Sequence, residues 1–146
     1  MKRIERRARV EAPPEELFAY LSDLANLPEW QPGIVSAEIT SGGDIGVGTT
    51  ATVVRDLMGQ RLEAPMTVTA YEPPSRLAIR GEVSGVKATA ELHLGPVDGG
   101  ATDLGFAMEI RGSFITSFME PMIAGAAGGE IDAGIARIQG RFAKPG

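Results

Sequence analysis

The feature of this 146-residue chain that most limits its fold is a long alternation of polar and apolar residues between residues 34 and 112. A period of two places successive side chains on opposite faces of a strand. Glycines interrupt the alternation at intervals that suit turns. The stretch therefore predicts a run of antiparallel strands that form a sheet with one apolar face and one wet face.

The first hairpin of this sheet can be phased from the residues around its turn. With Gly59-Gln60 as a two-residue turn, Arg55 lies opposite Ala64 and Val53 lies opposite Met66. This phase gathers the apolar side chains on one face. It also predicts that Arg55 points into that apolar face, between Val53 and Leu57.

The next two hairpins predict the same inner face. A turn at Ser84-Gly85 sets Glu82 opposite Lys87, which is a favourable cross-strand pair on the outer face. A register with Lys87 opposite Glu109 then continues the sheet into its last strand. The same phase puts His93 on the outer face, where we expect a surface residue and not a catalytic base. The residues placed inward are Ile79, Leu92, Leu104, Phe106, Met108 and Ile110.

Helical spacing occurs on both sides of this stretch. The segment "APPEELFAYLSDLANL" begins with prolines and glutamates, which is typical of a helix start. Residues 114–143 repeat apolar side chains with a period of 3.6, and this helix cannot bury its stripe alone. Because an apolar sheet face needs a cover, we expect the long helix to lie on it. The predicted order is one strand over residues 3–11, two short helices, six strands and the long helix.

Composition narrows the classes of protein. The formal net charge of −5 argues against a nucleic-acid surface. The absence of cysteine from the sequence excludes disulfides, and a single histidine excludes His-rich zinc sites. We expect one cytoplasmic domain over residues 1–146, with no metal, no cofactor and no membrane span. The sequence does not distinguish a monomer from a homodimer.

Five stretches carry a family resemblance: "EAPPEELFAYLSDLANLPEW", "GVGTTATV", "VTAYEPPSRLAIRG", "GGATDLGFAMEI" and "IDAGIARIQGRF". In this order the chain resembles the START-like or SRPBCC superfamily, also called the helix-grip fold. More narrowly, it looks like the polyketide cyclase/dehydrase and lipid-transport branch. The resemblance implies an α+β fold, in which a curved antiparallel sheet of seven strands wraps around the long C-terminal helix. Two short helices lie between the first two strands, and a cavity lies between sheet and helix.

Trp30, in "NLPEWQPGI", is the only tryptophan of the chain and lies between two prolines. Two interpretations are open. The ring can act as a core plug between the short helices and the sheet, or it can contact a ligand directly.

Arg55 is the other candidate, because an inward arginine needs a partner or water. As a functional residue it would anchor a ligand carboxylate, phenolate or enolate. As a structural residue it would reach solvent or pair within the protein, for example with Asp132.

We expect the remaining lining of the cavity to be apolar, and its methionines would suit a site that adapts to its ligand. The glycines of "AGAAGGEIDAG" either let the long helix approach its neighbours closely or leave room for a ligand. The predicted lining consists of Val53, Leu57, Met66, Val68, Ile79, Leu92, Phe106, Met108, Phe118 and Met122.

Three functions follow as hypotheses, since the superfamily binds or transforms many unrelated apolar molecules. The first is binding of a small hydrophobic or aromatic molecule that is polyketide- or lipid-like. This hypothesis includes transport of that molecule. The second is a cyclase or dehydratase in which Arg55 stabilises an enolate, although the sequence offers no catalytic signature. The third is a protein-interaction domain with a filled core and an exposed apolar patch. The first predicts a pocket of about 300–1,000 Å³ between sheet and long helix.

Overall fold

The computed structural model of the chain describes residues 2–57, 59–83, 85–112 and 120–143. The alternating stretch forms the predicted sheet, in which every neighbouring pair of strands is antiparallel. Its seven strands lie in the order β1-β7-β6-β5-β4-β3-β2. They are β1 (Lys2–Val10), β2 (Ile34–Ile39), β3 (Thr50–Leu57), β4 (Gln60–Glu72), β5 (Arg76–Val83), β6 (Val86–Val97) and β7 (Ala101–Gly112).

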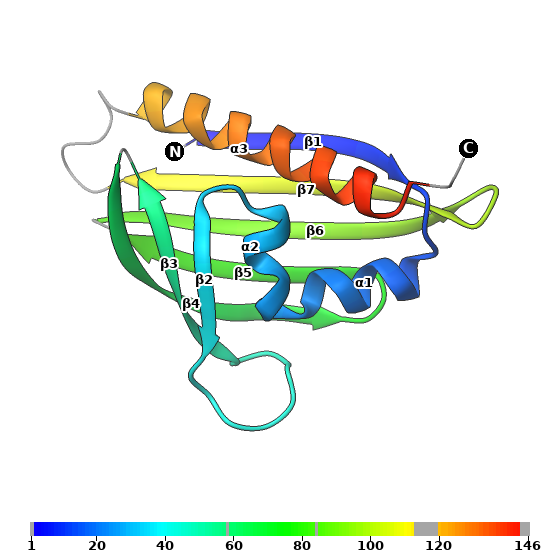
Figure 1. Ribbon diagram of the computed structural model, residues 1–146, viewed down its shortest axis with the longest axis horizontal. Helices are drawn as coiled ribbons and strands as arrows, with labels where there is room; N and C mark the ends of the chain where they lie inside the picture. The colour runs from blue at the N-terminus through cyan, green and yellow to red at the C-terminus, as the bar shows by residue number, and fades with distance from the viewer. Residues whose placement is uncertain (1, 58, 84, 113–119, 144–146) are drawn as a thin grey trace.

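The helices occupy the predicted places. Between β1 and β2 lie α1 (Pro14–Ser22), a 3₁₀ turn η1 (Leu24–Asn26) and α2 (Leu27–Trp30), and the long helix α3 (Glu120–Arg141) follows β7. Figure 1 shows α3 running alongside β1 and β7, with α1 and α2 on the same side of the sheet. The predicted long helix began at residue 114, and its first part lies outside the described residues. The α+β helix-grip arrangement is confirmed.

The register of the β3–β4 hairpin differs from the prediction by two residues. Arg55 lies opposite Leu62, and Val53 opposite Ala64. The predicted turn at Gly59-Gln60 is therefore wrong, because Gln60 is already paired with Leu57. Gly59 has a φ of 82°, a conformation that tight hairpin turns demand. A shift of two residues leaves every side chain on its predicted face.

The next two hairpins had different outcomes. The predicted pairing of Glu82 with Lys87 is confirmed. The pairing of Lys87 with Glu109 is wrong, since Lys87 lies opposite Arg111. Glu109 instead lies opposite Arg3 of β1 and accepts a hydrogen bond from its Nη1 at 2.9 Å. An opposite charge on the other neighbouring strand thus satisfies Glu109.

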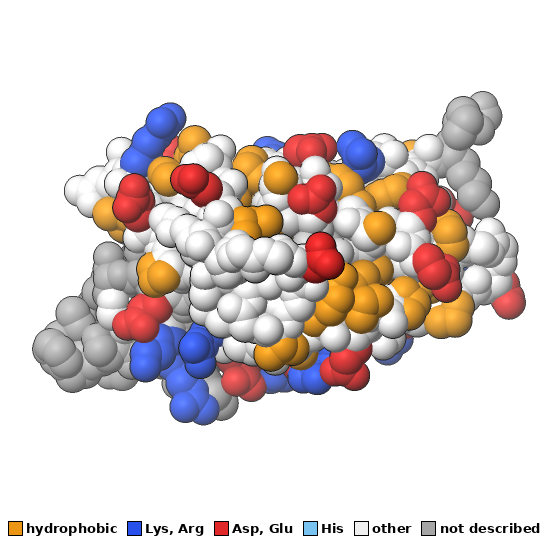
Figure 2. All heavy atoms as spheres, turned by 90° about the horizontal axis from the view of Figure 1, so that it is seen from below, with side chains coloured by type: hydrophobic (Ala, Val, Ile, Leu, Met, Phe, Trp, Pro, Cys, Tyr) orange, Lys and Arg blue, Asp and Glu red, His pale blue; other side chains and the backbone are white. Residues whose placement is uncertain are grey.

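The core lies between the concave face of the sheet and the three helices. Inward side chains of the sheet and the apolar side of the helices are almost fully buried, among them Leu17, Leu21, Val68, Leu77, Leu92, Leu104 and Ile138. Large hydrophobic side chains that are exposed occur singly on β2, in the following loop and at the end of β6. On the face seen in Figure 2, acidic side chains are spread among hydrophobic and uncharged ones.

The glycines of α3 serve different purposes. A Cβ added to Gly134 would lie 2.5 Å from the carbonyl oxygen of Trp30, so this glycine permits the close approach of α3 to the end of α2. At Gly128 a Cβ would lie 3.3 Å from Arg6 Nη2. Gly125 and Gly129 have open space around them. Close packing therefore explains Gly134, and it does not explain Gly125 or Gly129.

Substituting two of these glycines should change stability in opposite directions. Gly134→Ala should lower the free energy of unfolding by about 1–3 kcal/mol, since the added methyl forces α2 and α3 apart. Gly129→Ala is the matched control, and it should raise stability by up to about 1 kcal/mol through helix propensity alone. Urea titration of the two variants checks this. A stabilising Gly134→Ala would show that the helices do not touch there.

Candidate functional site

The concave side holds a small internal void at the place where α2, α3 and β7 meet. Its empty space is about 180 Å³, in gaps too narrow for a water molecule. This is below the predicted range of about 300–1,000 Å³. The side chains of the helices fill more of the space than the sequence analysis allowed. The void is lined by Trp30, Gln31, Phe106, Ile131, Gly134, Ile135 and Ile138.

Some apolar side chains of the concave face are only partly buried. Met66 and Ala90 point inward from the strands near the β5–β6 turn, and both are only partly buried. Met108 and Ala127 are also partly buried and pack against the core. Beneath the second half of α3, by contrast, side chains such as Leu104 are fully buried. These partly buried side chains keep apolar surface that a ligand could cover.

Arg55 points toward the helices, where it contacts α3. Its Nη2 donates a hydrogen bond to Oε2 of Glu130 at 2.6 Å. Both side chains are about three-quarters buried, with 25% and 28% of their surface exposed. The partner suggested by the sequence, Asp132, instead accepts a hydrogen bond from Arg6 Nε at 2.8 Å. That suggestion was wrong because Glu130 lies closer to β3 on the helix surface.

Gly33 makes room for this ion pair. A Cβ at Gly33 would lie 2.6 Å from Glu130 Oε1 and 2.8 Å from Arg55 Nη2. The carbonyl oxygen of Gly33 accepts a hydrogen bond from the backbone N–H of Asp56 at 2.9 Å, which ties the α2–β2 connection to β3. Three segments distant in sequence therefore meet at one half-buried charge pair.

The predicted site residues divide into three groups. Trp30 and Phe106 line the void, and each is 3% exposed. Phe118 and the side chains of Leu57 and Met122 lie outside the described residues. The others, Arg55 among them, do not line the void. Four of them lie in the core cluster, Val53, Val68, Ile79 and Leu92, and the partly buried Met66 and Met108 pack against it.

Two polar residues of the concave side, Glu130 and Gln31, were not predicted as site residues. Glu130 directly precedes Ile131 of the apolar stripe of the long helix, and this position could have indicated that its side chain lies at the edge of the buried face. Ile131, Ile135 and Ile138 belonged to the stripe but were not proposed as lining. No group of three or more His, Asp or Glu side chains suited to a metal ion occurs in the described part of the chain.

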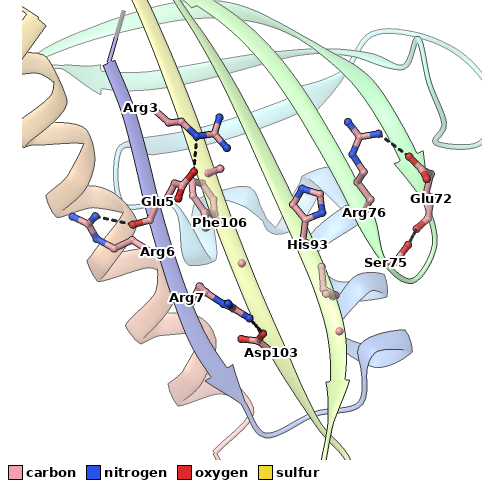
Figure 3. A pocket seen from close by; sticks show the side chains of 14 residues that line it. Arg3, Glu5, Arg6, Arg7, Glu72, Ser75, Arg76, His93, Asp103 and Phe106 are labelled. Atoms are coloured by element: carbon pink, nitrogen blue, oxygen red, sulfur yellow. Dashed lines mark hydrogen bonds and ion pairs between the residues drawn. The ribbon is translucent and has the colours of Figure 1, made fainter.

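A larger depression, of about 540 Å³, lies on the opposite face of the sheet. Figure 3 shows Arg7 turned toward Asp103 and Arg76 toward Glu72 in its wall. A second hydrogen bond from Arg76 lowers the pKa of the Glu91 carboxyl. His93 is 57% exposed there, as predicted. This depression is open, and its guanidinium groups are paired, so it does not suit an apolar ligand.

The architecture defines the class of protein. A curved antiparallel sheet of seven strands around a long C-terminal helix, with short helices after the first strand, is the helix-grip fold of START-like (SRPBCC) proteins. The chain belongs to the polyketide cyclase / dehydrase and lipid transport family, which it matches over residues 1–143. The family resemblance of the sequence motifs is thereby confirmed. Among the described residues, no helix is long and apolar enough to cross a membrane.

Similar proteins include an uncharacterized protein of Mycobacterium tuberculosis, 26% identical over 133 residues, which are 90% of this chain and 92% of that protein. The Zhui aromatase/cyclase from Streptomyces sp. R1128 superposes with a TM-score of 0.83 at 15% identity, covering 97% of this chain and 93% of that one. A START superfamily protein from Mycobacterium smegmatis gives a TM-score of 0.77 at 17% identity over 96% of both chains. At these identities the solved structures show the fold alone.

The Arg55–Glu130 pair should contribute measurably to stability. A double-mutant cycle with Arg55→Met and Glu130→Gln should give a coupling free energy of about 1 kcal/mol, since both side chains are about three-quarters buried. The matched control is the cycle with Arg6→Met and Asp132→Asn. That pair is more exposed, so its coupling should be less than about 0.5 kcal/mol. Urea unfolding of the two sets measures both values. Equal couplings would mean that the Arg55 pair is no better protected from solvent.

Proposed function

We propose that the protein binds a small hydrophobic or aromatic molecule, polyketide- or lipid-like, between the sheet and the first half of α3. The observation that carries the proposal is the partly exposed apolar surface of Met66 and Met108, which faces the concave side. Covering such surface favours binding, and methionine side chains adapt to irregular ligands. The proposed location of the protein is the cytoplasm.

A ligand of ordinary size is larger than the void beside Trp30, so binding requires α3 to move away from the sheet. The Arg55–Glu130 pair joins β3 to α3, and it would have to break or shift during this movement. In the proposal, the carboxylate or other anionic group of an acidic ligand replaces Glu130 on the guanidinium. The rest of the contact surface is the apolar lining that the sequence predicted.

Two matched fluorescent probes test this function. N-phenyl-1-naphthylamine is neutral, and 8-anilino-1-naphthalenesulfonate adds a sulfonate to the same ring system. Both should bind saturably. Arg55→Leu should weaken binding of the sulfonate probe by about 1.5–3 kcal/mol and leave the neutral probe almost unchanged. Arg55→Lys should restore part of the loss, because an ammonium lacks the two-pronged geometry.

Each result has a clear reading. Loss of both probes in Arg55→Leu, with the fold intact by circular dichroism, would remove the anchoring role of Arg55. No saturable binding of either probe to the natural protein would contradict the binding function. Native mass spectrometry of protein purified from its own source complements the titration. A dimer without a small molecule would favour the interaction-domain hypothesis, with exposed Val35 and Ile39 of the edge strand β2 at the interface.

A cyclase or dehydratase is the second candidate, and Glu130 is the observation that favours it. The sequence offered only arginines on the inner face, which cannot serve as general bases. The Glu130 carboxylate, 2.6 Å from Arg55, could accept a proton from the carbon next to a carbonyl while Arg55 stabilises the enolate oxygen. In a poly-β-keto thioester the enolate carbon would attack a second ketone of the same chain, and the aldol formed would lose its hydroxyl group and a proton as water. Incubation with such a thioester should then yield a cyclic product lighter by one water, and Glu130→Gln should abolish it. An unchanged thioester would exclude this reaction for that substrate.

A further inference from the structure

Trp30 carries a polar group that its surroundings leave without a partner. Its indole Nε1 is the only buried side-chain polar atom in the described part of the chain that makes no hydrogen bond. The residue as a whole is 3% exposed. A buried indole N–H normally finds an acceptor, and an unmet one costs stability. Such a group calls for a functional explanation.

The side chains that line the void together with Trp30 offer almost no acceptor. They are hydrocarbon side chains, those of Phe106, Ile131, Ile135 and Ile138. Gln31 is the only lining side chain with an oxygen, and it does not accept from Nε1. The gaps are too narrow for a water molecule. Neither the protein nor solvent therefore supplies an acceptor at this place.

The backbone of Trp30 is also fixed in place. The carbonyl oxygen of Trp30 lies against Gly134, where there is no room for a Cβ. The backbone N–H of the next residue, Gln31, donates to the carbonyl oxygen of Leu27 at 2.8 Å and closes the turn of α2. A phenylalanine would fill much of the same volume without an unmet N–H. The backbone that carries the indole is thus fixed, and Trp30 lies beside an apolar space.

We propose that Trp30 Nε1 donates a hydrogen bond to an uncharged oxygen of the bound ligand. The ligand would be an apolar molecule that carries a carbonyl oxygen, and a pure hydrocarbon would bind less well. This inference rests on the proposed binding function and narrows the class of ligand. It differs from the anchoring role of Arg55, because the guanidinium already has Glu130 as a partner and selects anions.

Because Trp30 is the only tryptophan, its indole N–H gives a single signal in a ¹H–¹⁵N correlation spectrum. The probes are 2-acetylnaphthalene and 2-isopropenylnaphthalene, in which a methylene group replaces the carbonyl oxygen. The ketone should move the indole proton downfield, as a new hydrogen bond does, and the hydrocarbon should not. The ketone should also bind about fivefold more tightly, the effect of one neutral hydrogen bond.

A variant series separates the hydrogen bond from packing. Trp30→Phe should bind both probes with equal affinity, because it keeps an aromatic ring and loses the donor. Ile135→Val is the control, since it trims the lining without removing a polar group, and it should keep the fivefold preference. Amide spectra of both variants report whether the fold is intact. The indole shift in the natural protein decides the question even if Trp30→Phe does not fold.

The inference fails if both probes bind and the ketone leaves the indole proton in place. It also fails if Trp30→Phe retains the preference for the ketone. The binding function survives either of these results. If neither probe perturbs any signal of the protein, the proposed binding function is contradicted, and this inference with it.

Discussion

The contact between α3 and the carbonyl oxygen of Trp30 is the constraint on which the rest of the concave side depends. It requires a glycine at position 134 and brings α2 against the long helix. The same end of α3 is held by Arg141, whose guanidinium lies 4.4 Å from the centre of the Tyr20 ring and 3.3 Å from Glu29. The second half of α3 is therefore fixed to α1 and α2 by packing, charge and ring contacts together.

The middle of α3 is attached to the sheet in a different way. Arg55 and Arg6 reach it from the sheet through Glu130 and Asp132. Ion pairs that keep partial contact with water contribute about 0–1 kcal/mol each, so they can open at small cost. Burial of Ile138 and its neighbours, by contrast, removes much apolar surface from water. If these ion pairs opened, the space next to Ile131 would widen, and the proposed ligand would enter there.

The sequence predicted the faces and the order of the strands better than their registers. Alternation determines which side of the sheet a residue occupies, and a slip of two residues leaves that side unchanged. The pairs Arg55–Leu62 and Lys87–Arg111 could therefore not be distinguished from the predicted ones by pattern. In the first case the pairing of Leu57 with Gln60 determines the register, and that pairing is visible only in the structure.

The candidate site was less predictable than the fold because it depends on contacts between elements. The alternation of polar and apolar residues indicated that Arg55 faces inward. The partner of Arg55, however, depends on how α3 is rotated about its axis and on the distance between α3 and β3. Either of two acidic residues near Ile131 could have filled that role, and Glu130 does. The small void could not be predicted at all, since its volume depends on the packing of Phe106 and Ile135 against Trp30.

Two glycines outside the apolar pattern control the polar groups of this site. Gly33 leaves the space in which Arg55 and Glu130 meet, and Gly134 sets the distance between α3 and the backbone of Trp30. The Arg55–Glu130 pair and the backbone of Trp30 are thus each held next to a glycine. A larger residue at Gly33 or Gly134 would push the neighbouring atoms away. Recognition of an anion by Arg55 and of a neutral oxygen by Trp30 Nε1 would then depend on these two glycines, which have no side chain to offer the ligand. The specificity of the proposed site would then depend on the space left free at Gly33 and Gly134 as well as on the side chains of the lining.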